Sequence, residues 1–254
     1  MFSEAIYIPV VSVCPVREAP NHRSEMTSQL LLGEQVHVLD NSVEGWLQIR
    51  SLHDGYEGWC QAIQLAELVN PTEPLGYYDR ELGFANVNGQ PMPVFMGTPV
   101  YQNPIKAGVF SISFTGLTTS LPEEYDNQVQ VAEIAFQYLN TPYLWGGRTF
   151  AGIDCSGFVQ MVYRQLGIHM QRDAWMQAAE GESVGFLQEA QPGDLAFFDE
   201  PDGRITHVGI LLNDHEIIHS SGKVRIDDID HQGIVSRDQK KRTHQLRIIK
   251  RYFR

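Results

Sequence analysis

The chain has 254 residues, of which 43% are hydrophobic, and its formal net charge at pH 7 is -12. This length is enough for one large domain or two modest ones, and the hydrophobic content is ordinary for a globular protein. The negative charge argues against a protein that binds nucleic acid, because affinity for phosphate backbones depends on clustered lysine and arginine.

Basic residues cluster near the C-terminus, at Arg237, Lys240, Lys241, Arg242, Arg247, Lys250, Arg251 and Arg254. We interpret this cluster as a solvated face and as part of an edge strand, where lysine discourages pairing between sheets.

The three cysteines, Cys14, Cys60 and Cys155, are too few and too scattered for a disulfide framework, so a reducing compartment is the simpler reading. The N-terminus has no basic region, and Pro9 interrupts it before a hydrophobic run reaches signal-peptide length. No run approaches the roughly 20 apolar residues of a membrane span. We therefore expect a cytoplasmic protein that does not cross a membrane.

Residues 1–69, the first part of the chain, are predicted to form short strands separated by turn residues. The predicted strands are 6–13, 35–40, 45–51 and 56–63. This spacing predicts a small antiparallel barrel. An ordered set of short motifs, at 15–17, 29–34, 45–46 and 54–59, resembles bacterial SH3-like (SH3b) domains. The two Gly-Trp pairs within that set carry little weight alone, because such a tryptophan is often only a core aromatic.

Residues 70–122 are rich in proline, which favours short strands, sheet edges and turns over helices. We predict a small β segment that leads into the next domain. A degenerate second SH3b barrel and an ordered linker are the alternatives for this part of the chain.

The pattern changes in residues 123–254. Apolar spacing predicts an amphipathic helix over 123–139 and a second helix that follows Cys155 and stops near Gly167. A polar connection is expected at 172–177. Strands are then predicted at 194–199, 207–212, 216–221 and 246–252. Helices followed by strands indicate an α+β domain in which helices pack on an antiparallel sheet.

Cys155 comes directly before the second of these helices. At a helix N-terminus, the unpaired backbone N–H groups and the helix dipole favour a thiolate, which is the reactive form of cysteine. We therefore take Cys155 as a candidate nucleophile.

A nucleophilic cysteine needs a base within hydrogen-bond reach, and usually a third group that orients the base. His207 and His219 lie on two predicted strands joined by a short turn. If residue 212 pairs with residue 216, then Gly209 faces His219, and the two histidines become diagonal neighbours on one face of the sheet. His207 is then the better base and His219 the better orienting group.

Other interpretations of these residues remain open. A single histidine in a strand is more often structural than catalytic, and a lone buried cysteine is usually only a small hydrophobic residue. Zinc is a further use for cysteine and histidine, but the histidines lack finger spacing and the chain has no Cys-x-x-Cys motif. We predict neither a metal nor another cofactor.

The C-terminal part of the chain is similar to NlpC/P60 cysteine peptidases across residues 123–254. The blocks that carry the resemblance appear in the family's order: Thr141-Pro-Tyr143-Leu-Trp-Gly146-Gly147, Asp154-Cys155-Ser156-Gly157, Arg172-Asp173, Pro192-Gly193-Asp194, His207-Val-Gly209-Ile and Ile218-His219-Ser220. The resemblance implies a papain-like catalytic domain that cleaves amide bonds of bacterial cell-wall peptides. It also implies that Cys155 is the nucleophile, His207 the base and His219 the third polar residue, with Tyr143 near the nucleophile.

The SH3b region makes the resemblance narrower. The whole chain looks like the γ-D-glutamyl-L-diamino-acid endopeptidases, which take murein stem peptides with a free N-terminal L-alanine. The implied contacts to this substrate come from Asp154, Ser156, Tyr56, Arg172 and Asp173. Each has a structural alternative: Asp154 as a helix cap, Tyr56 as a barrel aromatic, and Arg172 with Asp173 as an ion pair. Ala174 stands where relatives often carry serine.

These inferences predict a hydrolase that recycles released stem peptides, with no nucleic acid as partner. Two other functions remain as alternatives. One is a catalytically inactive protein that binds cell-wall peptide, and the other is an amidase or acyltransferase of the NlpC/P60 type that acts on another substrate.

Overall fold

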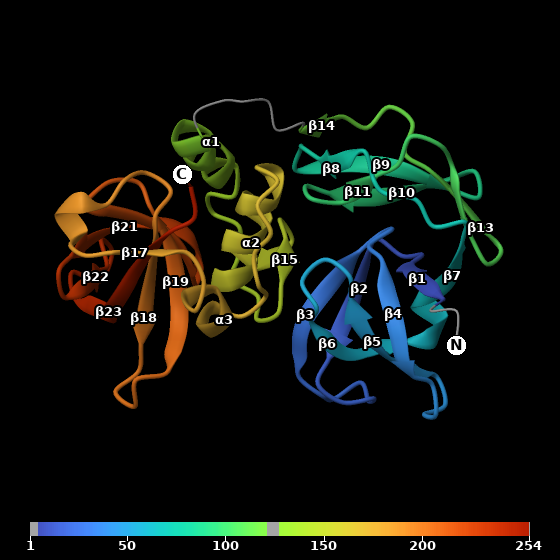
Figure 1. Cartoon of the computed structure of the whole chain (residues 1–254), viewed down its shortest axis with the longest axis horizontal. Coiled ribbons are helices and arrows are strands. Elements are labelled where there is room, and N and C mark those ends of the chain that lie inside the picture. Colours follow the sequence, from blue (N-terminus) through green and yellow to red (C-terminus); the bar gives the residue numbers. More distant parts are fainter. Residues whose placement is uncertain (1–4, 121–126, 254) are drawn as a thin grey trace. The chain divides into compact units, whose positions relative to one another are not determined.

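The computed structural model describes residues 5–120 and 127–253 (Figure 1). The contacts divide the chain into two compact units, one made of Met1–Leu121 with Trp145–Thr149 and the other of Pro122–Leu144 with Phe150–Arg254. The boundary predicted at 122/123 lies outside the described residues.

The first unit begins with the strands β1 (Ile6–Pro9), β2 (Val13–Arg17), β3 (Met26–Leu31), β4 (Val36–Asp40), β5 (Trp46–Ser51), β6 (Glu57–Gln61) and β7 (Leu65–Val69). A 3-10 turn, η1 (Ala62–Gln64), links the last two. Three predicted strands correspond to β4, β5 and β6. The strand predicted at 6–13 is confirmed over Ile6–Pro9 as β1, but it is not continuous, because the chain bends after Pro9 and enters β2 at Val13. Proline has no N–H for the next ladder bond, which favours this break.

Seven more strands follow in the first unit: β8 (Gly76–Tyr78), β9 (Leu82–Val87), β10 (Gln90–Phe95), β11 (Pro99–Val100), β12 (Ile105–Ala107), β13 (Phe110–Ser113) and β14 (Thr119–Ser120). One sheet runs in the order β10-β9-β13-β12-β7-β1-β4-β5-β6-β2-β3, and β11-β8-β14 form a smaller sheet. Residues 76–120 are therefore mostly β-strand.

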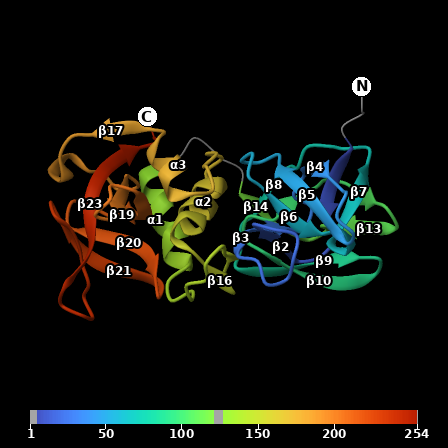
Figure 2. The same cartoon turned by 90° about the horizontal axis from the view of Figure 1, so that it is seen from below.

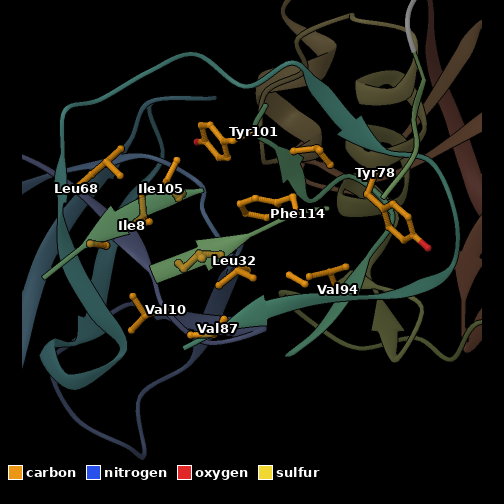
Figure 3. Close-up of a cluster of buried hydrophobic side chains, with 14 residues drawn as sticks. Ile8, Val10, Leu32, Leu68, Tyr78, Val87, Val94, Tyr101, Ile105 and Phe114 are labelled. Carbon is orange, nitrogen blue, oxygen red and sulfur yellow. The ribbon is translucent and has the colours of Figure 1, made fainter. Parts of the chain in front are cut away.

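Two hydrophobic clusters stabilise this unit. One contains Cys14 and Cys60, both fully buried free thiols, among the apolar side chains of the first barrel. The other joins Ile8 and Leu32 of the N-terminal strands to Tyr101 and Phe114 of the later segment (Figure 3). Because side chains from both segments share one core, residues 5–69 and 76–120 stabilise each other.

The short segment Trp145–Thr149 belongs to the first unit by its contacts. Arg148 forms a buried ion pair with Glu34, at 3.0 Å between Nη1 and Oε2, and its backbone N–H donates to Gln29 Oε1 at 2.8 Å. Gly146 has a φ of 74°, and a Cβ there would lie 2.4 Å from the carbonyl oxygen of Met26. A glycine is needed at this position, because other residues fit neither the φ nor the space.

The helices of the second unit are α1 (Asn127–Gln137), α2 (Cys155–Gln165) and α3 (Ala174–Ala178). The helix predicted over 123–139 corresponds to α1, although residues 123–126 lie outside the described residues. The polar connection predicted at 172–177 is wrong, because α3 begins within it at Ala174. A helix of one turn is too short to give a recognisable apolar period.

The segment Trp145–Thr149 contains β15 (Arg148–Thr149). The strands of the second unit are β16 (Gly152–Ile153), β17 (Glu182–Val184), β18 (Leu195–Asp199), β19 (Ile205–Leu211), β20 (Glu216–Ser221), β21 (Lys223–Asp230), β22 (Gly233–Val235) and β23 (Arg242–Arg251). A second 3-10 turn, η2 (Leu187–Glu189), precedes β18. The main sheet is antiparallel, in the order β17-β23-β18-β19-β20-β21-β22, and β22 also pairs with β23, so the sheet closes on itself.

The basic cluster near the C-terminus is not on an edge strand, which corrects our interpretation. Its residues in β23 lie on a strand with neighbours on both sides. Several of them form ion pairs: Arg237 with Glu216, Arg242 with Asp230, and Arg251 with Asp194. Of their acidic partners, Glu216 lies on β20, Asp230 on β21 and Asp194 just before β18.

The helices pack together on one side of the strands of this unit (Figure 2). Helix α2 contacts β19 and β20, α3 contacts β19, and α1 contacts α2. This arrangement places the N-terminus of α2 against β19. Over residues 5–120 and 127–253, no helix is long and apolar enough to cross a membrane.

Candidate active site

Cys155 is the first residue of α2 and is 6% exposed. Asp154 caps the helix, and its Oδ1 accepts a hydrogen bond of 2.6 Å from the backbone N–H of Gly157. The Cys155 thiol lies 4.0 Å from the carbonyl oxygen of Thr206 and also receives a hydrogen bond from the backbone of Val208. The sulfur therefore lies against the stretch of β19 that carries His207.

The Cys155 thiol is less acidic than its position at the helix terminus led us to expect. Burial, with a smaller effect from the Asp154 carboxylate, raises the pKa of Cys155 to about 12, although the backbone of Val208 and the charge of Arg172 act in the other direction. Desolvation penalises the charged thiolate more than the helix terminus stabilises it. The cysteine of the free protein is thus a neutral thiol at pH 7.

The register predicted for the histidine strands is confirmed. Gly209 pairs with His219, and the backbone N–H of Leu212 donates to the carbonyl oxygen of Glu216 at 2.9 Å. A Cβ at Gly209 would lie 2.8 Å from the Cβ of His219 and 2.7 Å from Ile217. The absence of a side chain at residue 209 therefore leaves room for the His219 side chain.

The two histidines are in direct hydrogen-bond contact. His207 Nε2 lies 2.8 Å from His219 Nδ1, and the two rings are nearly perpendicular. His219 Nε2 lies 3.1 Å from Oδ2 of Asp227, which is on β21. All three side chains are buried. The structure thus brings Cys155, His207 and His219 together as predicted, and it adds Asp227 behind them.

Asp227 and His244 were not predicted from the sequence. Asp227 lies opposite Ile217 of β20. The sequence around it contains no motif that points to a role in the site. His244 of β23 stacks on His207, with ring centroids 4.2 Å apart and planes 22° apart. A prediction of the β20–β21 hairpin register would have placed Asp227 beside His219, but β21 had not been recognised as a strand.

Burial keeps the site histidines neutral. It lowers the pKa of His207 well below its ordinary value, helped by the neighbouring His219 and His244, and it lowers the pKa of His219 despite the hydrogen bond to Asp227. The pKa of His244 falls to about 4, chiefly through burial. A neutral imidazole beside a neutral thiol is a pair in which the imidazole is able to accept the thiol proton.

Arg172 lies beneath the start of α2 and is 1% exposed. It donates from Nη2 to Asp154 Oδ2 at 2.6 Å and from Nη1 to Ser156 Oγ at 2.9 Å. Asp154 is therefore both a helix cap and half of a buried ion pair, so its structural alternative is confirmed. The three residues hold the backbone on both sides of Cys155.

Tyr143 and Asp173 lie closer to solvent. Tyr143 is half-buried, and burial, together with the nearby Cys155, raises the pKa of its phenol. It remains an O–H donor at neutral pH. Asp173 is half-buried at the N-terminus of α3. Tyr56 belongs to the first unit, in the turn before β6, and its substrate contact stays a prediction.

Comparison with known proteins agrees with this geometry. The model of the NlpC/P60 family matches residues 140–243, a span that includes the cysteine and both catalytic candidates on β19 and β20. A second model, described as a bacterial dipeptidyl-peptidase SH3 domain, matches residues 16–65. The chain therefore carries an NlpC/P60 domain over residues 140–243 and a bacterial SH3 domain ahead of it.

Individual relatives share this organisation. Gamma-D-glutamyl-L-lysine dipeptidyl-peptidase of Bacillus subtilis is 28% identical over an alignment of 213 residues, and the match covers 76% of this chain and 71% of the relative. Dipeptidyl-peptidase 6 of Lysinibacillus sphaericus is 25% identical over 84% of this chain and 88% of the relative. The crystal structure of an NlpC/P60 family protein from Bacillus cereus superposes with a TM-score of 0.79 at 19% identity, covering 98% of this chain and all of that one. This last likeness shows the shared fold.

Proposed function

We propose that the protein is a cysteine endopeptidase that hydrolyses the γ-D-glutamyl-L-diamino-acid bond of murein stem peptides with a free N-terminal L-alanine. The observation that carries this proposal is the buried contact between His207 and His219 beside the Cys155 thiol. The names of the relatives, which specify a γ-D-glutamyl-L-lysine bond, support the choice of substrate.

In this mechanism His207 removes the proton of Cys155 as the sulfur attacks the γ-glutamyl carbonyl carbon. The tetrahedral intermediate collapses to a thioester when the proton passes from His207 to the departing amine of the diamino acid. Water then attacks the thioester, with His207 again as base, and releases L-Ala-γ-D-Glu. Because burial raises the pKa of the Cys155 thiol, His207 has to take the thiol proton for the sulfur to attack.

Charge on the carbonyl oxygen has to be stabilised during both attacks. Tyr143 is suited to this role, because its phenol stays protonated and lies near Cys155. The N–H groups at the start of α2 provide further donors next to the sulfur.

For the substrate ammonium group, the candidates differ in availability. Arg172 occupies the carboxylate of Asp154, and it also donates to Ser156. These residues therefore support the backbone around Cys155, and the charge of Asp154 is balanced by that of Arg172. Asp173 is more exposed than Asp154 and is the better direct partner for an ammonium group, and Tyr56 remains a candidate from the SH3 domain. A requirement for a free amine fits the recycling of released peptides, since the L-alanine of intact peptidoglycan is amide-linked.

The direct test is incubation of the protein with L-Ala-γ-D-Glu-meso-diaminopimelate and its L-lysine counterpart, each free or N-acetylated, with products identified by mass. We expect L-Ala-γ-D-Glu from the free peptides and little product from the acetylated ones. Failure to cleave any of the four peptides would refute the proposed substrate class, and equal cleavage of free and acetylated peptides would refute the free-amine requirement.

A further inference from the structure

We infer that Asp227 is a positioning residue that fixes the tautomers of His219 and His207, and thereby leaves Nδ1 of His207 as the basic nitrogen that faces Cys155. This inference deepens the proposed function and rests on the proposed role of His207 as base. It starts from three buried side chains on adjacent strands, β19, β20 and β21.

The two carboxylate oxygens of Asp227 have different partners. Oδ1 accepts hydrogen bonds from Arg225 Nη2 at 2.9 Å and from the backbone N–H of Arg237 at 2.8 Å. Oδ2 faces His219 Nε2 at 3.1 Å. The donors at Oδ1 fix the orientation of the carboxylate, so Oδ2 is held toward the histidine.

Asp227 is ionised at neutral pH. Burial by itself would raise the pKa of this carboxyl, but the hydrogen bonds from His219, the Arg237 backbone and Arg225 lower it to about 2. An ionised carboxylate accepts hydrogen bonds and donates none. The proton between Asp227 and His219 must therefore be on Nε2 of His219.

This assignment determines the next hydrogen bond. A neutral imidazole with its proton on Nε2 has a lone pair on Nδ1. His219 Nδ1 lies 2.8 Å from His207 Nε2, so His207 donates from Nε2. The lone pair of neutral His207 is then on Nδ1. Asp227 thus determines which nitrogen of the base is free, across two hydrogen bonds.

The substitution Asp227→Asn hardly changes the size and shape of the side chain. It reverses the direction of two hydrogen bonds, the one between residue 227 and His219 and the one between His219 and His207. The donors Arg225 and Arg237 N–H hold the amide oxygen in the place of Oδ1, so the amide NH2 faces His219 Nε2. That nitrogen must then accept, the His219 proton moves to Nδ1, and His207 Nε2 becomes the acceptor. His207 then carries its proton on Nδ1 and has no lone pair for the Cys155 thiol.

The matched control is Asp228→Asn. Asp228 is the next residue on β21, its side chain is largely exposed, and it pairs with Arg237 Nε at 2.8 Å. The control removes one carboxylate from the same strand and leaves the Asp227–His219 hydrogen bond in place.

The test combines two measurements that need no peptide substrate with one that does. In wild-type protein labelled with 15N-histidine, long-range 1H–15N spectra should show the Nε2–H tautomer for both His219 and His207. The rate of Cys155 alkylation by iodoacetamide at pH 7, mapped by mass, should fall in Asp227→Asn and stay at the wild-type level in Asp228→Asn. For peptide cleavage, we expect kcat to fall about 10- to 100-fold in Asp227→Asn with KM nearly unchanged, the cost typical of a group that orients a functional histidine from behind.

An Nδ1–H tautomer of His219 in wild-type protein would overturn the inference, and this measurement requires no variant to fold. Equal alkylation rates in folded Asp227→Asn and wild-type protein would also overturn it. If wild-type protein shows the predicted tautomers but cleaves none of the stem peptides, the proposed substrate is wrong and the assignment of Asp227 stands.

Discussion

At the scale of single residues, the site depends on side chains kept neutral by burial. The rings of His219 on β20 and His244 on β23 contact His207, the Cys155 thiol lies against the carbonyl oxygen of the preceding Thr206, and the carboxylate of Asp227 acts on His207 through His219. Neighbouring imidazoles and burial both disfavour a positive charge on His207. The base is therefore unprotonated over a wider range of acid pH than an ordinary histidine.

We expect His244 to influence the pH range over which His207 is unprotonated. Its substitution by alanine would expose one face of His207 and remove a neighbouring imidazole, and both changes raise the pKa of His207. Since protonated His207 is inactive as a base, the acid limb of kcat/KM should move upward toward pH 6.5 in His244→Ala. His244→Phe keeps a ring over His207 and should shift the limb less. Superimposable acid limbs for the wild-type protein and His244→Ala would show that the stacked ring has no influence on the base.

Some residues of the site could be predicted from the sequence, and others could not. Cys155, His207 and His219 could be predicted because each lies in a local motif, and the strand register followed from a three-residue turn. Asp227 and His244 could not, because β21 was not recognised as a strand and His244 meets His207 only through the long-range placement of β23 beside β18. The low acidity of Cys155 also depends on burial by β19, which no local pattern reports.

At the scale of elements, the start of α2 combines a cap with a buried ion pair. Asp154 accepts from the Gly157 N–H and pairs with Arg172, so both the helix terminus and a buried cation depend on it. The strands β4, β5, β6, β18, β19, β20 and β23 could be predicted from alternation and turns, whereas the short α3 and strands such as β3, β21 and β22 were not predicted. The closure of the sheet by the β22–β23 pairing is a long-range contact that leaves no local signal.

We therefore expect Asp154→Ala to lower the stability of the second unit strongly, by about 3–5 kcal/mol, because it leaves Arg172 buried without its main partner. Asp154→Ser retains a hydroxyl for the cap and should recover about 1 kcal/mol of this loss. Urea unfolding of the two variants measures both values. A stable Asp154→Ala protein with a raised KM alone would instead assign Asp154 to substrate binding.

At the scale of the whole molecule, the same buried histidines link stability to pH. Their pKa values in the folded protein lie below the ordinary value of about 6.5, so the unfolded chain binds more protons below that pH. Stability is fully present above pH 6.5 and is lost as pH falls toward the folded-state values, which for His244 is about 4.

Urea unfolding should therefore give a lower free energy of unfolding at pH 5 than at pH 7, by on the order of 1 kcal/mol for each buried histidine. His244 is partly exposed and should contribute least. Replacement of His244 by phenylalanine removes one titrating group and should reduce the pH dependence. Equal stability of the wild-type protein at the two pH values would contradict the neutral, buried state of these side chains.

In the proposed mechanism, Cys155 forms a thioester with the γ-carboxyl of D-glutamate. The most direct measurement is rapid acid quenching of the protein during turnover of L-Ala-γ-D-Glu-meso-diaminopimelate, followed by mass analysis of the digested chain. We predict an adduct with the mass of L-Ala-γ-D-Glu less one water on the fragment that contains Cys155, and neither adduct nor turnover in folded Cys155→Ala. Turnover by Cys155→Ala above a few per cent of the wild-type rate, or an adduct on another residue, would contradict the account.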